Sequence, residues 1–242
     1  MTATKASPLA DFNPAVAPEV FALCPDYCAL SIVAHEVTNS TAHPEVAALG
    51  EAIGRSWSRP TWAEAHLESW RAAYRSFGAR PHRTPSSAEA LLKRLAADGH
   101  LPSINAAVDL YNAISVGYAT PVGGENIAAY VGHPRLIRAA GHEPFDTVKD
   151  GIAQVEIVPA GEVVWCDDRG VTCRRWNWRQ GVRTRIDAST RQMWFVLERL
   201  EPMPVVALLE AGQLLVSTLA QMSPGASIRT TFISREGSIR NP

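Results

Sequence analysis

The sequence has few cysteines, almost no net charge and no long uninterrupted apolar stretch. Its 242 residues include four cysteines, 23 lysines and arginines, and 24 aspartates and glutamates, for a formal net charge of −1. Four cysteines are too few for a disulfide scaffold in a chain of this length. The balanced charge excludes a polycation that binds nucleic acid over its whole surface, so any such binding needs a local basic patch.

Neither a membrane span nor a secretion signal is visible. Apolar runs such as Val205–Leu209 are far shorter than the roughly 20 residues that cross a bilayer. The N-terminus has one lysine and no apolar stretch of signal-peptide length. Apolar residues make up 46% and charged residues 19%, which is typical of a globular protein. We therefore expect a cytoplasmic protein with no membrane partner.

Familiar catalytic and metal-binding motifs are also missing. We find no Gly-x-Ser-x-Gly turn, no Gly-x4-Gly-Lys phosphate loop, no dinucleotide Gly-x-Gly-x-x-Gly and no His-x-x-x-His spacing. Cys24 and Cys28 have the spacing of half a zinc site, but no matching Cys/His pair follows. We expect buried free thiols, no metal and no cofactor. A covalent nucleophile with a base nearby in the sequence is not visible.

Helical signals dominate the first half of the chain and strand signals the second. Residues 1–18 predict a flexible tail. Periodicity, prolines and caps predict helices over 44–57, 60–77, 86–98, 105–116 and 205–222. Alternation and apolar runs predict strands over 27–37, 154–158, 162–166, 171–176 and 228–234. The mixed signals of 188–200 predict neither element, and Pro121 with two glycines predicts a loop over 120–125.

This order of elements favours an α/β fold of the α+β kind. We expect one layered domain over residues 19–242, with a mixed β-sheet flanked by helices. Two short motifs predict where individual elements begin or turn. Ser86 and Glu89 form a capping box, and Asp167–Gly170 has the composition of a hairpin turn.

A polar stripe on an apolar helix is the first candidate for chemistry. If the chain is helical from Asn105, then Asn105, Asp109 and Asn112 fall at i, i+4 and i+7 and share a face. Ser103 stands just before them. Buried polar side chains need partners, since leaving them unpaired costs several kcal/mol. They form either a structural network that pins the helix or the scaffold of a pocket.

The second candidate is the glycine-containing segment after this helix. Pro121, Gly123 and Gly124 allow the backbone to approach a ligand closely, and Glu125 stands beside them. Most Gly-Gly pairs are only turns. This one lies next to the polar helix, which favours a pocket rim.

The third candidate is an arginine- and tryptophan-rich stretch. Arginine offers a planar fork to phosphate, and tryptophan stacks on bases. The alternative is a solvated charged hairpin with buried tryptophans. The residues concerned are Arg174, Arg175, Trp176, Asn177, Trp178 and Arg179.

Three motifs together resemble a known family. They are Leu91-Leu92-x-Arg94-Leu95, Ile104-Asn105-x-x-Val108-Asp109-x-x-Asn112 with Pro121 nine residues later, and Arg183-x-x-x-x-Ala188-x-Thr190-Arg191 followed by Val196-Leu197-Glu198. Over about residues 85–200 the chain resembles the tRNA-editing module of the phenylalanyl-tRNA synthetase β chain. It is most similar to free-standing B3/B4-domain proteins, which share Pro-Val-Gly-Gly-Glu and Arg-Arg-Trp-Asn-Trp-Arg. This sequence differs from the family at one site position: the family has a histidine two residues after the proline, and this sequence has Gly123 there.

The resemblance implies a function in translation quality control. A trans-acting deacylase would bind the aminoacylated end of tRNA and hydrolyse a wrongly attached amino acid with an oriented water. Asn105, Asp109, Asn112 and Glu125 would then serve catalysis. Substrate contacts would come from Ser103, Pro121, Gly123, Gly124 and residues 174–179. Two alternatives stay open, a module that binds tRNA or an amino-acid-like ligand without chemistry, and a hydrolase of small esters or amides.

Overall fold

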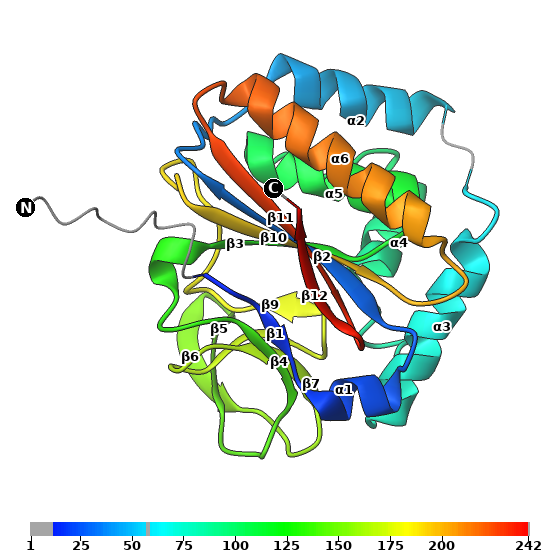
Figure 1. The fold of residues 1–242 in the computed structure, drawn as a ribbon, viewed down its shortest axis with the longest axis vertical. Coiled ribbons are helices and arrows are strands. Elements are labelled where there is room, and N and C mark those ends of the chain that lie inside the picture. Colours follow the sequence, from blue (N-terminus) through cyan, green and yellow to red (C-terminus); the bar gives the residue numbers. More distant parts are fainter. Residues whose placement is uncertain (1–11, 57–58, 242) are drawn as a thin grey trace, which may run out of the picture.

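The fold, seen in a computed structural model that describes residues 12–56 and 59–241, combines two β-sheets with six α-helices in those residues (Figure 1). The helices are α1 (Pro18–Leu23), α2 (Pro44–Ser56), α3 (Ala63–Ser76), α4 (Ser87–Asp98), α5 (Ala106–Tyr118) and α6 (Val205–Met222). A short 3-10 turn, η2, covers Ile127–Ala129.

The first sheet is antiparallel, with strand order β12-β11-β2-β10-β3. Its strands are β2 (Cys28–His35), β3 (Val122–Asn126), β10 (Met193–Arg199), β11 (Ser227–Ser234) and β12 (Gly237–Asn241). The second sheet is mixed, with order β1-β4-β7-β8-β5-β6 and β9 paired to β8. Its strands are β1 (Ala15–Val16), β4 (Arg135–Arg138), β5 (Pro144–Lys149), β6 (Ile152–Ile157), β7 (Val163–Cys166), β8 (Val171–Arg174) and β9 (Arg179–Gln180).

The first sheet lies between a layer of helices and the second sheet. Helices α2, α5 and α6 cover one face, and the second sheet lies on the other side (Figure 1). Leu30 and Phe195 pack toward α5 and α6, whereas Val33 and Trp194 share a core with Trp165 of β7. The layered α+β fold class is confirmed, and the assignment of 19–242 to one domain stays a prediction.

Helix α6 is apolar because it packs on a sheet. By length and composition it is the one candidate for a membrane span in the described residues, but its inner face contacts β2 and β10. A Cβ added at Gly212 would lie 2.0 Å from Leu30 Cδ2, so glycine lets the helix come close to β2. Val206 and Leu209 remain exposed on the outer face.

Most predicted elements are confirmed, and two expectations are wrong. The segment 120–125 is not a loop, because residues from Val122 onward form β3 at the edge of the first sheet. The predicted tail is too long, since β1 begins at Ala15 and α1 at Pro18; residues 1–11 lie outside the described residues, as does Trp57. The ambiguous segment 188–200 contains the central strand β10.

The predicted free thiols are confirmed. All four cysteines are free, and Cys24, Cys28 and Cys166 are buried. Burial raises the pKa of the Cys24 thiol to about 11.

Candidate active site

A cavity of about 260 Å³ lies where the edge strand β3 meets α4, α5 and the β8–β9 hairpin. It draws its walls from both sheets and from the helical layer. The lining residues are Ser87, Ala90, Leu91, Tyr111, Asn112, Val122, Gly123, Gly124, Glu125, Trp165, Cys173, Trp176, Asn177, Trp178, Gln180, Val196 and Glu198.

The two glycines of β3 face opposite sides of the sheet. Gly123 lies opposite Val196, so a side chain there would point toward the second sheet. A Cβ added at Gly123 would meet only Val196 Cγ1, at 3.5 Å, whereas one at Gly124 would lie 2.6 Å from the Tyr111 ring. Gly124 is therefore required by packing against α5, and Gly123 leaves space in the cavity.

Glu125 is a buried carboxyl group on the same face of β3 as Gly123. It lies opposite Trp194 in the β3–β10 pair and accepts a short hydrogen bond from the Tyr130 hydroxyl. Burial raises the pKa of Glu125 to about 7, although hydrogen bonds from Tyr130 and neighbouring threonines oppose that shift. A carboxyl group with this pKa exchanges protons readily at neutral pH.

Glu198 is a second buried carboxyl group, on the same face of the neighbouring strand β10. Its Oε1 accepts from the Tyr27 hydroxyl at 2.8 Å and from both indole N–H groups of Trp165 and Trp176 at 3.2 and 3.0 Å. Its Oε2 accepts from Asn177 Nδ2 at 2.9 Å. Burial raises the pKa of Glu198 to about 7. With four donors already bound, Glu198 is suited to hold the cavity wall in place.

Two neutral polar groups are open to a ligand, and a third joins two walls of the cavity. The side chain of Asn112 lines the cavity, and no hydrogen bond joins it to another side chain in the described part of the chain. Ser87 Oγ is buried without a partner in the same part. The Gln180 amide donates to the Gly124 carbonyl oxygen at 2.9 Å and so ties the hairpin to β3.

Cys173 lines the cavity but is not an activated nucleophile. Burial, together with the nearby carboxylates of Glu125 and Glu198, raises the pKa of its thiol well above the usual range. The reactive thiolate is therefore disfavoured at neutral pH.

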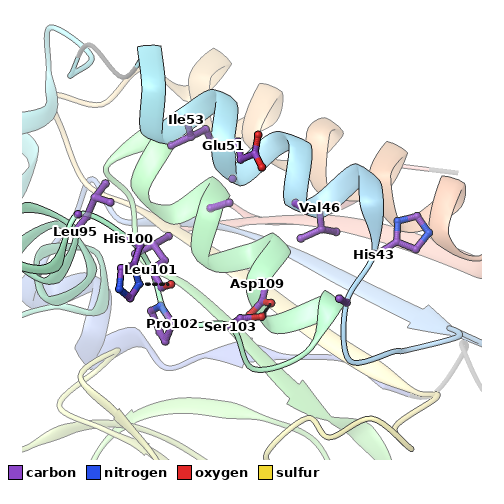
Figure 2. Close-up of a pocket in the computed structure, with 15 residues that line it drawn as sticks. His43, Val46, Glu51, Ile53, Leu95, His100, Leu101, Pro102, Ser103 and Asp109 are labelled. Carbon is purple, nitrogen blue, oxygen red and sulfur yellow. Dashed lines mark hydrogen bonds between the residues drawn. The ribbon is translucent and has the colours of Figure 1, made fainter.

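Half of the sequence-predicted site residues meet in this cavity. They are Asn112, Gly123, Gly124, Glu125, Trp176, Asn177 and Trp178. Ser103 and Asp109 do not join them but line a different cavity, where the Ser103 hydroxyl donates to Asp109 Oδ2 at 2.8 Å (Figure 2). The expectation that Asp109 and Asn112 face one pocket is wrong, because the neighbours of α5 divide its polar stripe between two cavities.

Asn105 and Pro121 have structural contacts outside the cavity. Asn105 is the N-cap of α5, since its side-chain oxygen accepts from the Val108 N–H at 3.1 Å. Its amide donates to the Ile186 carbonyl oxygen at 3.3 Å. The Pro121 carbonyl oxygen accepts from the Glu198 N–H at 3.0 Å and extends the β3–β10 pairing. Neither residue lines the cavity.

The three arginines of the hairpin have different environments. Arg174 is buried and forms a two-pronged pair with Glu162, at 2.9 Å for each contact, and a third contact with Glu156 at 2.7 Å. The Arg174 guanidinium group already binds two carboxylates, so this geometry contradicts the expectation that Arg174 binds phosphate. Arg175 and Arg179 lie close to the Trp178 ring, with guanidinium carbons 4.4 and 5.9 Å from the ring centroid. Arg175 Nε also lies 3.5 Å from Glu162 Oε2, which is a looser contact than those of Arg174.

Sequence reasoning did not assign Tyr111, Gln180 or Glu198 to the site. A signal existed for Glu198, because a charged residue ends the otherwise apolar run Trp194–Leu197. Such a charge in a buried strand needs partners and marks a special position. Tyr111 and Gln180 carry no such signal, since each enters the cavity only through contacts distant in sequence.

Comparison with known proteins shows the family of the segment that contains this cavity. Residues 69–211 match the B3/4 domain. The chain belongs to the B3/4 domain family. This match includes every residue that lines the cavity. No curated protein matches the sequence.

Among solved structures, this B3/4 domain is similar to an N-terminal fragment of the phenylalanyl-tRNA synthetase beta-subunit from Pyrococcus horikoshii. Sequence identity is 8%, and the TM-score is 0.49. The similarity covers 96% of this chain and 54% of the fragment, so the chain spans about half of its length.

Proposed function

We propose that this B3/4 domain is a cytoplasmic, trans-acting deacylase that hydrolyses an amino acid ester at the acceptor end of mischarged tRNA. The observation that carries the proposal is Glu125, a buried carboxyl with a pKa of about 7 beside the open space at Gly123. The motifs shared with synthetase editing modules support tRNA as the carrier of the ester. The raised pKa of the Cys173 thiol favours water as the nucleophile.

Glu125 would serve as the general base. Its carboxylate takes a proton from water while the water oxygen attacks the ester carbonyl carbon. The bond from this carbon to the ribose oxygen then breaks, and the proton passes to the ribose oxygen. The products are a free amino acid and tRNA with a free hydroxyl. Asn112 and Ser87 would hydrogen-bond the amino acid, because their polar groups face the cavity without side-chain partners in the described residues.

The terminal nucleotide would lie against Trp178. This ring lines the cavity, and Arg175 and Arg179 lie beside it. Aromatic rings stack on bases, and flanking guanidinium groups attract the phosphates. The substrate contacts predicted for Arg175, Trp178 and Arg179 therefore remain in the proposal, without Arg174. The polar groups of Trp176 and Asn177 bind Glu198 instead, so these two residues support the cavity wall.

Mischarged tRNAs provide the direct test. With enzyme in excess over a panel of tRNAs that carry different amino acids, we expect at least one ester to be lost well above its spontaneous rate. Release of labelled amino acid is the measurement. Free aminoacyl ethyl esters serve as controls. If they are hydrolysed as fast as aminoacyl-tRNA, the activity is that of a small-ester hydrolase. No ester loss from any tRNA would contradict the proposal.

Gly123→His is expected to narrow the cavity and change its selectivity. The backbone accepts a side chain at this position, and the imidazole would occupy space beside Val196. Differences in pocket size of this kind change kcat/KM by roughly 10- to 200-fold, so we expect a loss of this order for the best substrate. Thermal stability should change little. Unchanged rates on every ester would mean that β3 does not border the active site.

Gly124→Ala is the matched control on the neighbouring residue. Its Cβ would lie 2.6 Å from the Tyr111 ring, so this smaller substitution is expected to lower stability more than Gly123→His does.

A non-catalytic binding module is the second candidate. It is favoured by Gly123, which stands where the resembling family has its site histidine. This alternative predicts saturable binding of intact aminoacyl-tRNA with no release of the amino acid.

A further inference from the structure

The residues Ser103 and Asp109, which the first cavity does not use, border a second and larger cavity of about 560 Å³. It lies between α2, the end of α4, the segment 99–103 and α5 (Figure 2). None of the described residues lines both cavities. A cavity of this size is in the range that holds small molecules.

Gly50 keeps this cavity open. It lies inside α2, where glycine costs about 0.5–1 kcal/mol relative to alanine. Neither packing nor backbone geometry requires glycine here, because an added Cβ would meet nothing within 4 Å and its φ is not in the left-handed region. The small side chains of Ala47 and Ala113 also line the space. The absence of a side chain at Gly50 thus leaves space in the cavity that a larger residue would fill.

The walls of the second cavity are apolar and its charged groups are acidic. Val46, Ile53, Leu95 and Leu101 supply the apolar surface. Glu51 and Asp109 are the acidic lining residues, and no lysine or arginine is found among the described residues that line the space. The carboxylate of Asp109 disfavours phosphates and carboxylates and suits a cation.

Asp109 and His43 offer acceptors to such a cation. Asp109 Oδ2 accepts from the Ser103 hydroxyl and Oδ1 from the Ile104 N–H, both at 2.8 Å, so the carboxylate is held in position. Each oxygen keeps a further lone pair for a ligand. His43 Nδ1 is buried with no hydrogen-bond partner in the described part of the chain. Figure 2 shows Asp109 and Ser103 next to each other, with His43 at the start of α2.

We infer that this second cavity binds a small protonated amine with an apolar body, independently of the deacylase site. The ammonium group would lie at Asp109. The apolar body would fill the space beside Gly50, against Val46 and Leu101.

Three small probes with matched bodies test the inference: 2-phenylethylamine, 2-phenylethanol and 3-phenylpropionate. Binding to the full chain is measured by titration calorimetry, and the site is mapped by amide chemical shifts. We expect saturable binding of the amine, at least 10-fold tighter than that of the alcohol or the acid. Its shifts should be confined to residues 42–53 and 95–113.

Two variants locate the amine. Gly50→Leu fills the cavity at a position with open space, so it should fold normally and lose amine binding. Asp109→Asn should weaken the amine at least 10-fold and leave the alcohol unchanged. Glu125→Gln, in the other cavity, should bind the amine like wild type. Equal binding of all three probes, amine binding retained in Gly50→Leu, shifts that map to the first cavity, or no binding would each overturn the inference.

Discussion

Replacing Glu125 by glutamine is expected to lower kcat for ester hydrolysis by roughly 100- to 10,000-fold, the usual contribution of a general base. Glutamine keeps the shape and the acceptor for Tyr130 but cannot take a proton from water. In the wild type, turnover should rise as the pH increases through about 7, because Glu125 must lose its proton to act as the base. The variant should lose this pH dependence. Single-turnover rates between pH 5.5 and 8.5 provide the measurement.

The stability of the same variant is its control. The pKa of Glu125 is raised from 4.5 to about 7 on folding, so its contribution to stability is full below pH 4.5 and is lost as the pH rises through 7. Removing an ionised buried carboxylate should therefore leave Glu125→Gln at least as stable as wild type at pH 8. Exposed Glu236→Gln should retain full activity. If Glu125→Gln keeps the rate and pH profile of the wild type, another group is the base.

Arg174→Ala is expected to lower the free energy of unfolding by roughly 3–5 kcal/mol, because it leaves a buried carboxylate without its principal partner. The side chains of Arg174 and Glu162 are only 9% and 7% exposed, and their contact has two prongs. Urea unfolding at pH 7 is the measurement. The salt dependence of tRNA binding should not change, since the guanidinium group of Arg174 binds Glu162 and is not available to phosphate.

Arg179→Ala provides the contrasting variant. Arg179 is half-buried, donates to the Val148 carbonyl oxygen at 3.1 Å and lies beside Trp178. We expect little loss of stability, weaker tRNA binding and a salt slope lower by about one counterion. Arg174→Met, which loses the charge but keeps the apolar stem, should still destabilise the fold, because Glu162 then keeps only its weaker contacts with Arg175, at 3.5 Å from Nε and 3.1 Å from the backbone N–H. If Arg174→Ala lowers the salt slope and leaves stability unchanged, Arg174 contacts tRNA and does not stabilise the fold, which contradicts its assignment here.

The position of the candidate cavity was predicted better than the set of residues that lines it. Asn112, Gly123 and Glu125 come from stretches that the sequence singled out, and all three line the cavity. Asp109, three residues before Asn112 on the same helix, lines the other cavity instead. Helical periodicity tells which residues share a face, but the elements packed on either side decide what each side chain meets.

Sequence by itself determined the local features of this protein. The Ser86 and Asn105 caps, the end of α4 at Gly99, the hairpin at Asp167–Gly170 and the full length of α6 all depend on residues a few positions apart. Caps, turns and apolar periodicity are short-range effects, so their signals survive in a single sequence.

Only the tertiary structure decided which distant residues meet. Val122–Asn126 is a strand because β10, some 70 residues later, pairs with it, and this pairing brings Glu125 and Glu198 onto one sheet face. Arg174 is bound by Glu162 of the neighbouring segment and not by a ligand. Such contacts depend on strand order and register, which residues far apart in the chain set together. Only the folded chain therefore shows that Glu125 and Glu198 lie near each other, that Gly123 leaves space in the first cavity and that α5 borders two cavities.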